Sequence, residues 1–178
     1  MLAGFGLFVV VVVGGLLAIS LHSRKHPHDT PSEVTAAGRA VVGDSVPTVR
    51  AKTIDGSTVS LDTYRGRPLI VTFGASWCHP CRDEYPMLVR AQAQHPDLAV
   101  VGVMYQDLVM DERRILREFH ARWPAIDDPT GAIAGPFGVK AVPQLFFITP
   151  EGTVQDRVYG EVSAKEFGQR LDRLLAAR

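Results

Sequence analysis

The residues of this chain best suited to chemistry are its two cysteines. Among 178 residues, Cys78 and Cys81 are the only cysteines, and they lie in the stretch GASWCHPCRDEYP with a histidine and a proline between them. A pair at this spacing serves as a structural bridge, as half of a metal site, or as a couple that exchanges electrons with other thiols. The surrounding sequence has to distinguish among these roles.

Metal and haem sites fit the pair poorly. A structural zinc site needs four ligands, usually from a second cysteine pair or from paired histidines, and the chain has no further cysteine. Covalent haem attachment needs a histidine directly after the second cysteine, where Arg82 stands. A static bridge over so short a loop removes little entropy from the unfolded chain. We therefore predict no metal ligands, and no cofactor other than a redox-active Cys78–Cys81 disulfide.

A redox role needs a stable thiolate at Cys78. The pair follows an apolar segment, residues 69–75, and opens a predicted helix at residues 78–94. The free amides and the dipole at a helix N-terminus stabilise a thiolate and lower its pKa. Pro80 falls in the first turn, where its missing N–H costs nothing. We expect the thiolate of Cys78 to attack a disulfide and Cys81 to displace the captured partner.

Glu84 is the candidate proton carrier. It lies three residues after Cys81 and therefore on the same face of the predicted helix. A carboxyl group partly buried beside a thiol pair takes up and returns a proton. The alternative is that Glu84 is a first-turn acid that the helix dipole favours.

Strand patterns surround the pair. Residues 47–61 show two β-rich runs on either side of Asp55-Gly56, which predicts a hairpin. Residues 69–75 and 98–105 are short apolar runs, typical of strands that are buried on both faces.

The remaining elements complete an α/β pattern. Residues 111–123 carry apolar side chains at helical spacing. Strands are predicted at residues 144–149 and 153–160, and Ser163 with Glu166 forms a capping-box pattern before the last helix. This order predicts an α/β fold with a central mixed sheet flanked by helices.

The N-terminus predicts a membrane anchor. Residues 1–21 contain no charged side chain, and a helix of that length spans roughly 30 Å, the thickness of a bilayer's hydrocarbon core. A cleaved signal peptide is the alternative, with the small residues Ala18 and Ser20 at a suitable spacing for cleavage. We predict a flexible linker at residues 22–43 and a folded domain at residues 44–178.

Charge bears on partners and on topology. The 19 Lys and Arg residues balance 19 Asp and Glu residues without forming a basic stripe, which argues against a nucleic-acid partner. Arg24, Lys25 and Arg39 follow the apolar segment, and no Lys or Arg precedes it. Because basic residues normally stay in the cytoplasm, this bias alone places the folded domain there.

The stretch WCHPCRDEYPML resembles the active-site helix of membrane-anchored thioredoxin-like proteins of the TlpA/ResA type and of their DsbE (CcmG) relatives in cytochrome c maturation. TIDGSTVSLDTYRGRPLIVTFGASWC is similar to the N-terminal hairpin extension and first core strand of that family. DDPTGAIAGPFGVKAVPQLFFITPEGTV is similar to the segment that leads to its cis-proline loop. The resemblance covers residues 44–177.

The resemblance implies a thioredoxin fold, a single-pass anchor in the cell membrane, an extracytoplasmic domain and thiol–disulfide exchange. By position, Cys78 is the attacking thiol, Cys81 the resolving thiol and Glu84 the acidic residue beside them. Pro143 matches the cis-proline that faces the cysteines, and Val142 offers its backbone to an extended client strand. The neighbours of the pair that modulate it are Trp77, His79 and Pro80.

Three positions depart from the family pattern. Gly74 stands where the family usually has tryptophan, so packing under the active site must differ. Thr72 takes the place of the buried aspartate of cytosolic thioredoxins, which leaves proton handling to Glu84. His79 either stabilises the Cys78 thiolate and raises the reduction potential, or lies in solvent with little effect.

The sequence therefore predicts an oxidoreductase that reduces disulfides in client proteins, with apocytochrome c as a client that the family suggests and a membrane thiol-reductant transporter as the electron source. The alternatives are a thiol oxidase or isomerase of the same fold, and a Cu(I)-binding or apoprotein-binding chaperone that uses the pair as soft ligands. Antioxidant peroxidase activity is not expected, because Ala75 stands where peroxiredoxins carry threonine.

Overall fold

A computed structural model describes residues 33–35 and 40–177 of the chain. The predicted anchor at residues 1–21 and most of the predicted linker lie outside the described residues. The chain divides into two units, residues 1–31 and 32–178, and the fold below is that of the second. Within the described part of the chain, no helix combines the length and apolar character needed to cross a bilayer.

The second unit combines two sheets with three α-helices and one short 3-10 helix in the part that the structure describes. Its elements, in chain order, are β1 (Glu33–Thr35), β2 (Thr48–Lys52), β3 (Thr58–Ser60), η1 (Leu61–Tyr64), β4 (Leu69–Gly74), α2 (His79–Gln94), β5 (Ala99–Tyr105), α3 (Val109–Glu118), β6 (Ala125–Asp128), β7 (Gln144–Ile148), β8 (Val154–Tyr159) and α4 (Ala164–Ala176).

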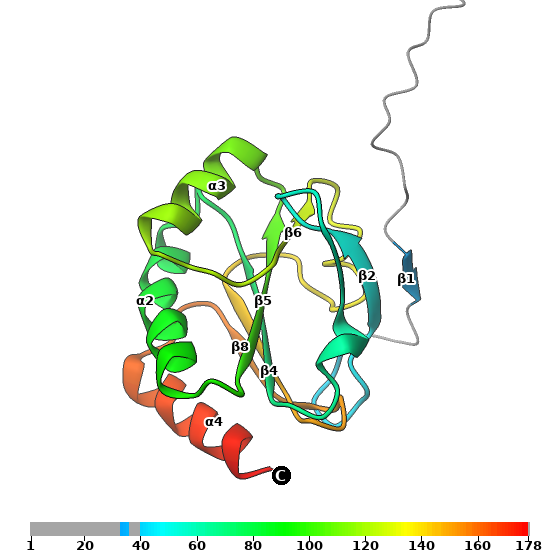
Figure 1. Cartoon of the computed structure of the whole chain (residues 1–178), viewed down its shortest axis with the longest axis vertical. Helices are drawn as coiled ribbons and strands as arrows, with labels where there is room; N and C mark the ends of the chain where they lie inside the picture. Colours follow the sequence, from blue (N-terminus) through cyan, green and yellow to red (C-terminus); the bar gives the residue numbers. More distant parts are fainter. Residues whose placement is uncertain (1–32, 36–39, 178) are drawn as a thin grey trace, which may run out of the picture. The chain divides into compact units, whose positions relative to one another are not determined.

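The larger sheet has the strand order β6-β5-β4-β7-β8. Strands β4, β5 and β6 run parallel, and β7 and β8 are each antiparallel to their neighbour. Helix α2 connects the parallel neighbours β4 and β5, because two parallel strands need a long crossover connection between them. The sheet is therefore the central mixed sheet that the sequence predicts. In Figure 1, α2, α3 and α4 lie on one side of it and β2 on the other.

Both faces of β4 are buried, so its apolar residues serve two cores. All six residues of the strand are buried, and successive side chains point to opposite faces. Ile70 packs in the cluster that holds Leu88 of α2 and Leu171 of α4. Phe73 packs in the cluster that holds Val49 of β2. The helices and the small sheet thus cover opposite faces and hold β4 in the centre.

The small sheet pairs β2 with β3 in antiparallel register, with Lys52 opposite Thr58. In the turn between them, Asp55 accepts a hydrogen bond from the Thr53 hydroxyl at 2.5 Å. Gly56 follows with a φ of 89°, a left-handed conformation that glycine adopts without strain.

Most predicted elements are confirmed with small changes at their ends. The capping box before α4 is present, since Ser163 and Glu166 each accept a hydrogen bond from the other's backbone N–H. The helix predicted at residues 111–123 instead spans Val109–Glu118. It ends where His120 takes a φ of 56°, and the buried Trp123 lies beyond it.

Two strands were not predicted. β6 has only four residues, and apolar and polar residues do not alternate clearly along it. It forms because its backbone pairs with that of β5. β1 pairs with β2 inside the segment predicted as a linker. Ala40, in the same segment, is fully buried and donates a hydrogen bond from its backbone N–H to the carbonyl of Pro136. The packed domain therefore reaches further toward the N-terminus than the predicted boundary at residue 44.

Candidate active site

Cys78 and Cys81 are joined by a disulfide at the start of α2. Cys78 is the N-cap of the helix, and Pro80 lies in its first turn. The Cys78 sulfur accepts a hydrogen bond from the backbone N–H of Cys81 at 3.2 Å. Cysteine thus takes the place that serine or aspartate usually fills at an N-cap, where a side-chain acceptor satisfies a free amide. The same amide, together with the helix dipole, stabilises negative charge on this sulfur when the disulfide opens.

Glu84 is buried directly behind the pair. Its side chain is 3% exposed, and its Oε1 atom has no hydrogen-bond partner. It lines a small hollow together with Thr72, Gly74 and Cys81. Loss of solvation on burial raises the pKa of Glu84 to about 8. The group therefore exchanges its proton near neutral pH, as a proton carrier beside a thiol must.

The alternative role for Glu84 is wrong. Helix α2 begins at His79, and its first turn contains no acidic residue. Glu84 therefore lies in the second turn, beyond the strongest effect of the dipole on exposed acids.

Tyr85 occupies the space beneath Gly74. A Cβ atom at Gly74 would lie 3.7 Å from both the Cys81 sulfur and the Tyr85 hydroxyl. The Tyr85 ring is itself stacked with Phe119 and Trp123, with centroids 5.2 and 5.8 Å away. An aromatic side chain from α2 thus fills the region under the active site, where the family usually has a tryptophan from the strand.

The Val142–Pro143 peptide bond is cis. Gln144, the first residue of β7, pairs with Phe73 of β4. Continued by one residue, this antiparallel register sets Pro143 opposite Gly74, which borders the Cys81 sulfur. The carbonyl of Pro143 accepts a hydrogen bond from Gly160, and Val142 packs partly buried against both cores. The cis-proline loop therefore lies beside the cysteine pair.

The residues that flank the disulfide face solvent. Trp77 is 60% exposed, and its indole N–H donates to the carbonyl of Gln106 at 3.2 Å. His79 and Pro80 are exposed as well. The structure thus places the three predicted modulators at the rim of the site and Glu84 beneath it.

Sequence reasoning missed Asp107. This residue follows β5, and its carboxylate accepts hydrogen bonds from the backbone N–H and the hydroxyl of Ser76, two residues before Cys78. The strand order could have indicated this contact, because the carboxyl ends of adjacent parallel strands meet at one edge of a sheet. Residues after β5 were therefore candidates to contact the loop after β4.

It also missed Glu112, a second buried carboxyl group. Glu112 is fully buried in α3, and neither carboxyl oxygen has a hydrogen-bond partner. Burial first, and then the nearby charges of Asp127 and Asp107, raise the pKa of Glu112 to about 8. Its helical spacing with Ile115 and Leu116 gave the only sequence sign that it points inward.

Within the described residues, no three His, Cys, Asp or Glu side chains form a group able to hold a metal ion.

A family comparison identifies what kind of protein carries this site. The sequence model of the AhpC/TSA family matches residues 42–157, which include the disulfide, Glu84 and the cis-proline. The chain belongs to the AhpC/TSA family.

Similar proteins of known type narrow the assignment. The thioredoxin-like protein YneN of Bacillus subtilis is 30% identical over 134 residues, covering 73% of this chain and 78% of YneN. A DsbE homologue of Paracoccus denitrificans, a thiol:disulfide interchange protein, is 33% identical over 148 residues, covering 78% and 79% of the two chains. The thiol-disulfide oxidoreductase ResA of Oceanobacillus iheyensis is 29% identical over 130 residues, covering 68% and 67%. This AhpC/TSA member is a thiol–disulfide oxidoreductase of the ResA and DsbE type.

Solved structures agree on the fold. The structure of MTB DsbF superimposes with a TM-score of 0.65 at 31% identity, covering 70% of this chain and 93% of DsbF. A thioredoxin family protein from Chlorobium tepidum superimposes with a TM-score of 0.68 at 23% identity, covering 76% and 98%. The predicted thioredoxin fold is confirmed.

Proposed function

We propose that this protein reduces disulfide bonds in client proteins, using Cys78 as the attacking thiol and Cys81 as the resolving thiol. The observation that carries the proposal is the disulfide at the N-terminus of α2, with the buried carboxyl group of Glu84 behind Cys81. The pair supplies two electrons, and the carboxyl group handles a proton.

The reaction runs in two exchanges. The Cys78 thiolate attacks one sulfur of the client disulfide, which forms a mixed disulfide and releases the other client sulfur as a thiolate. Glu84 in its carboxylate form then takes the proton of Cys81, and the resulting thiolate attacks the Cys78 sulfur. The Cys78–Cys81 disulfide forms, the second client sulfur leaves, and the two client thiolates take up protons. Two electrons pass from the protein to the client.

The surroundings of the pair favour the reducing direction. Once Glu84 is ionised, which its raised pKa of about 8 delays, its carboxylate repels a thiolate at Cys81, destabilises the dithiol state relative to the disulfide and lowers the reduction potential. His79 would act the opposite way as a cation, but it lies in solvent, where its charge is screened.

Location and partners form part of the same proposal. The apolar residues 1–21 anchor the protein in the cell membrane as a single span, and the domain faces the extracytoplasmic side. A reductase on that side needs electrons from across the membrane, which a membrane thiol-reductant transporter supplies. DsbE-type and ResA-type relatives support an interchange role. Apocytochrome c is the client class that we propose. The Lys and Arg bias opposes this topology.

The reduction potential of the Cys78–Cys81 couple tests the direction. We expect a value nearer to that of thioredoxin, about −270 mV, than to that of DsbA, about −120 mV. A value near that of DsbA would instead support an oxidase or isomerase.

Insulin reduction in the presence of dithiothreitol tests the activity itself. A Cys78→Ser variant should lose it, because the remaining Cys81 is buried inside α2, away from the N-cap position that activates Cys78. Unchanged activity in that variant would remove the proposal. Tight stoichiometric Cu(I) binding without dithiol turnover would support the chaperone alternative.

A further inference from the structure

The turn between β5 and α3 is bonded to the two residues that precede Cys78. The Asp107 carboxylate accepts hydrogen bonds from the backbone N–H of Ser76 and, at 2.8 Å, from its hydroxyl. The indole N–H of Trp77 donates to the carbonyl of Gln106 at 3.2 Å. Asp107 and Ser76 are 31 residues apart in the chain, so these are tertiary contacts.

The turn itself is held in a defined shape. Oδ1 of Asp107 also accepts a hydrogen bond from the backbone N–H of Leu108 at 2.8 Å. Gln106, with a φ of 50°, donates its N–H to the carbonyl of Asp128 at 3.0 Å. Hydrogen bonds to an ionised carboxylate are about twice as strong as neutral ones. Asp107 therefore forms the stronger part of the connection.

This connection matters most when the disulfide is open. In the disulfide form, the bond to Cys81 holds Cys78 at the N-cap of α2. In the dithiol form that covalent link is gone. Cys78 then depends on its own hydrogen bonds. In the disulfide form these run from its N–H to the carbonyl of Ala75 and from the N–H of Cys81 to its sulfur, each 3.2 Å long. It also depends on the position of Ser76 and Trp77.

We propose that Asp107 is a positioning residue that keeps Cys78 at the start of α2 in the dithiol form, acting through Ser76. The proposal rests on thiol–disulfide exchange at this pair, and it is independent of the direction proposed above.

The charge of Asp107 offers a competing explanation with the opposite sign. If positioning dominates, removal of Asp107 destabilises the dithiol form more than the disulfide form, and the reduction potential falls. If charge repulsion dominates, its removal stabilises the Cys78 thiolate and the potential rises. The sign of the change in potential therefore separates the two.

The test compares wild type with an Asp107→Ala variant. We expect the equilibrium constant for reduction of the pair to fall about tenfold, which is about 30 mV toward reducing potentials. Urea unfolding should show a larger loss of stability in the dithiol form than in the disulfide form. On the alkaline plateau, where Cys78 is fully ionised, exchange with a small aromatic disulfide should slow about tenfold, because the thiolate is misplaced.

Two further variants sharpen the comparison. Asp107→Asn should recover part of the loss, because one oxygen still accepts the Ser76 N–H. Ser76→Ala removes only the hydroxyl bond and should shift the potential less, in the same direction. If Asp107→Ala fails to fold, this variant carries the test alone.

Asp55→Ala is the matched control, because Asp55 accepts the same kinds of hydrogen bond, from Thr53 and Ser57, in the turn between β2 and β3. It should lose equal stability in both redox states and keep the wild-type potential. An unchanged or raised potential in Asp107→Ala, or equal losses in its two redox states, would overturn the proposal. A wild-type potential on the oxidant side would revise the proposed direction and leave this comparison intact.

Discussion

Cys78 combines two tasks that most N-cap residues do not share. Its sulfur caps α2 by accepting the N–H of Cys81, and it is also one end of the disulfide. When the disulfide opens, the cap becomes a thiolate at the positive end of the helix, where it is both stabilised and reactive. Cys78 lies at the N-cap and Cys81 within the first turn of α2, so we assign the first attack on a client disulfide to Cys78.

Replacing Cys81 should therefore trap clients. In a Cys81→Ala variant, Cys78 still attacks the client, but no second thiol is present to release it. We expect mixed disulfides with client proteins to accumulate and to disappear on addition of dithiothreitol, as measured by non-reducing gel electrophoresis and mass spectrometry. The reverse variant, Cys78→Ser, should trap far less. Equal trapping by the two variants would contradict the assigned roles.

Glu84 gives the site a pH dependence. Its pKa is raised to about 8 by burial, so the carboxylate that accepts the Cys81 proton becomes available only as the pH approaches that value. Glu84→Gln cannot accept a proton. We expect the variant to lose the rise in the rate of mixed-disulfide resolution around pH 8, with a decrease of about tenfold or more at the wild-type plateau. Rapid-quench measurements from about pH 5 to pH 9 would test this.

The same variant should change the pH dependence of stability. A carboxyl group with a raised pKa in the folded state binds its proton more tightly there than in the unfolded chain. Its stabilising contribution is therefore complete below about pH 4 and is lost as the pH rises toward 8. Glu84→Gln should remove that loss, on the order of 3 kcal/mol, when urea unfolding is compared at about pH 5 and pH 8. Glu112→Gln, which removes the other buried carboxyl group, should alter the stability curve similarly and leave the resolution step unchanged.

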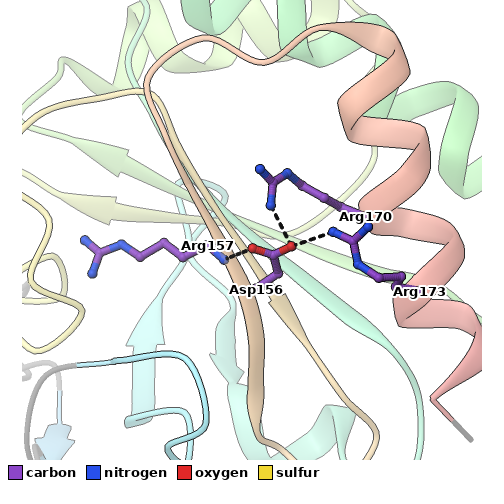
Figure 2. A network of polar contacts seen from close by, with 4 residues as sticks. All are labelled: Asp156, Arg157, Arg170 and Arg173. Carbon is purple, nitrogen blue, oxygen red and sulfur yellow. Dashed lines mark hydrogen bonds and ion pairs between the residues drawn. The ribbon is translucent and has the colours of Figure 1, made fainter.

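At the scale of elements, α4 is fastened to the edge strand β8 by one carboxylate. Figure 2 shows Asp156 of β8 between Arg170 and Arg173 of α4, while the side chain of Arg157 points away. Asp156 accepts from Arg170 at 2.6 Å and from Arg173 at 2.9 Å. Partial burial alone would raise the pKa of Asp156. The hydrogen bonds from the two arginines outweigh this effect and hold that pKa below its ordinary value.

Asp156→Ala should weaken the docking of α4. We expect a loss of about 1 to 2 kcal/mol in the free energy of unfolding at neutral pH, because the variant leaves two arginines side by side without their shared acceptor. Since the pKa is lowered in the folded state, the wild-type advantage should fade as the pH falls below the ordinary range of an aspartate. Hydrogen exchange should rise first in α4. Asp62→Ala, which removes an exposed pair with Arg65, should cost less than about 0.5 kcal/mol.

At the scale of the whole molecule, the proposed membrane anchor leads to a prediction about the side of the membrane that the domain faces. The family resemblance and the basic residues after the apolar segment point in opposite directions, and residues 1–32 lie outside the described part of the chain. We predict that a membrane-impermeant thiol reagent labels reduced Cys78 in cells with an intact inner membrane. A cytoplasmic protein labelled only after lysis serves as the control. Labelling of Cys78 only after lysis would place the domain in the cytoplasm.

The sequence by itself determined the elements that have a strong local signal. Uninterrupted apolar runs specified β4 and β5, a capping box specified the start of α4, and two cysteines at the start of a helix specified the site. Each of these patterns is formed by residues close together in the chain, so each can be recognised in a short stretch of sequence.

Only the tertiary structure decided the features that depend on distant partners. β6 exists because β5 lies beside it, and Glu112 is buried because its helix packs with that side inward. Asp107 supports the active-site loop from 31 residues away. Ionisation of Glu84 near neutral pH likewise reflects the hollow around it rather than its spacing from Cys81. Burial and long-range hydrogen bonds are set by the whole packed chain, so a local pattern gives at most a weak sign of them.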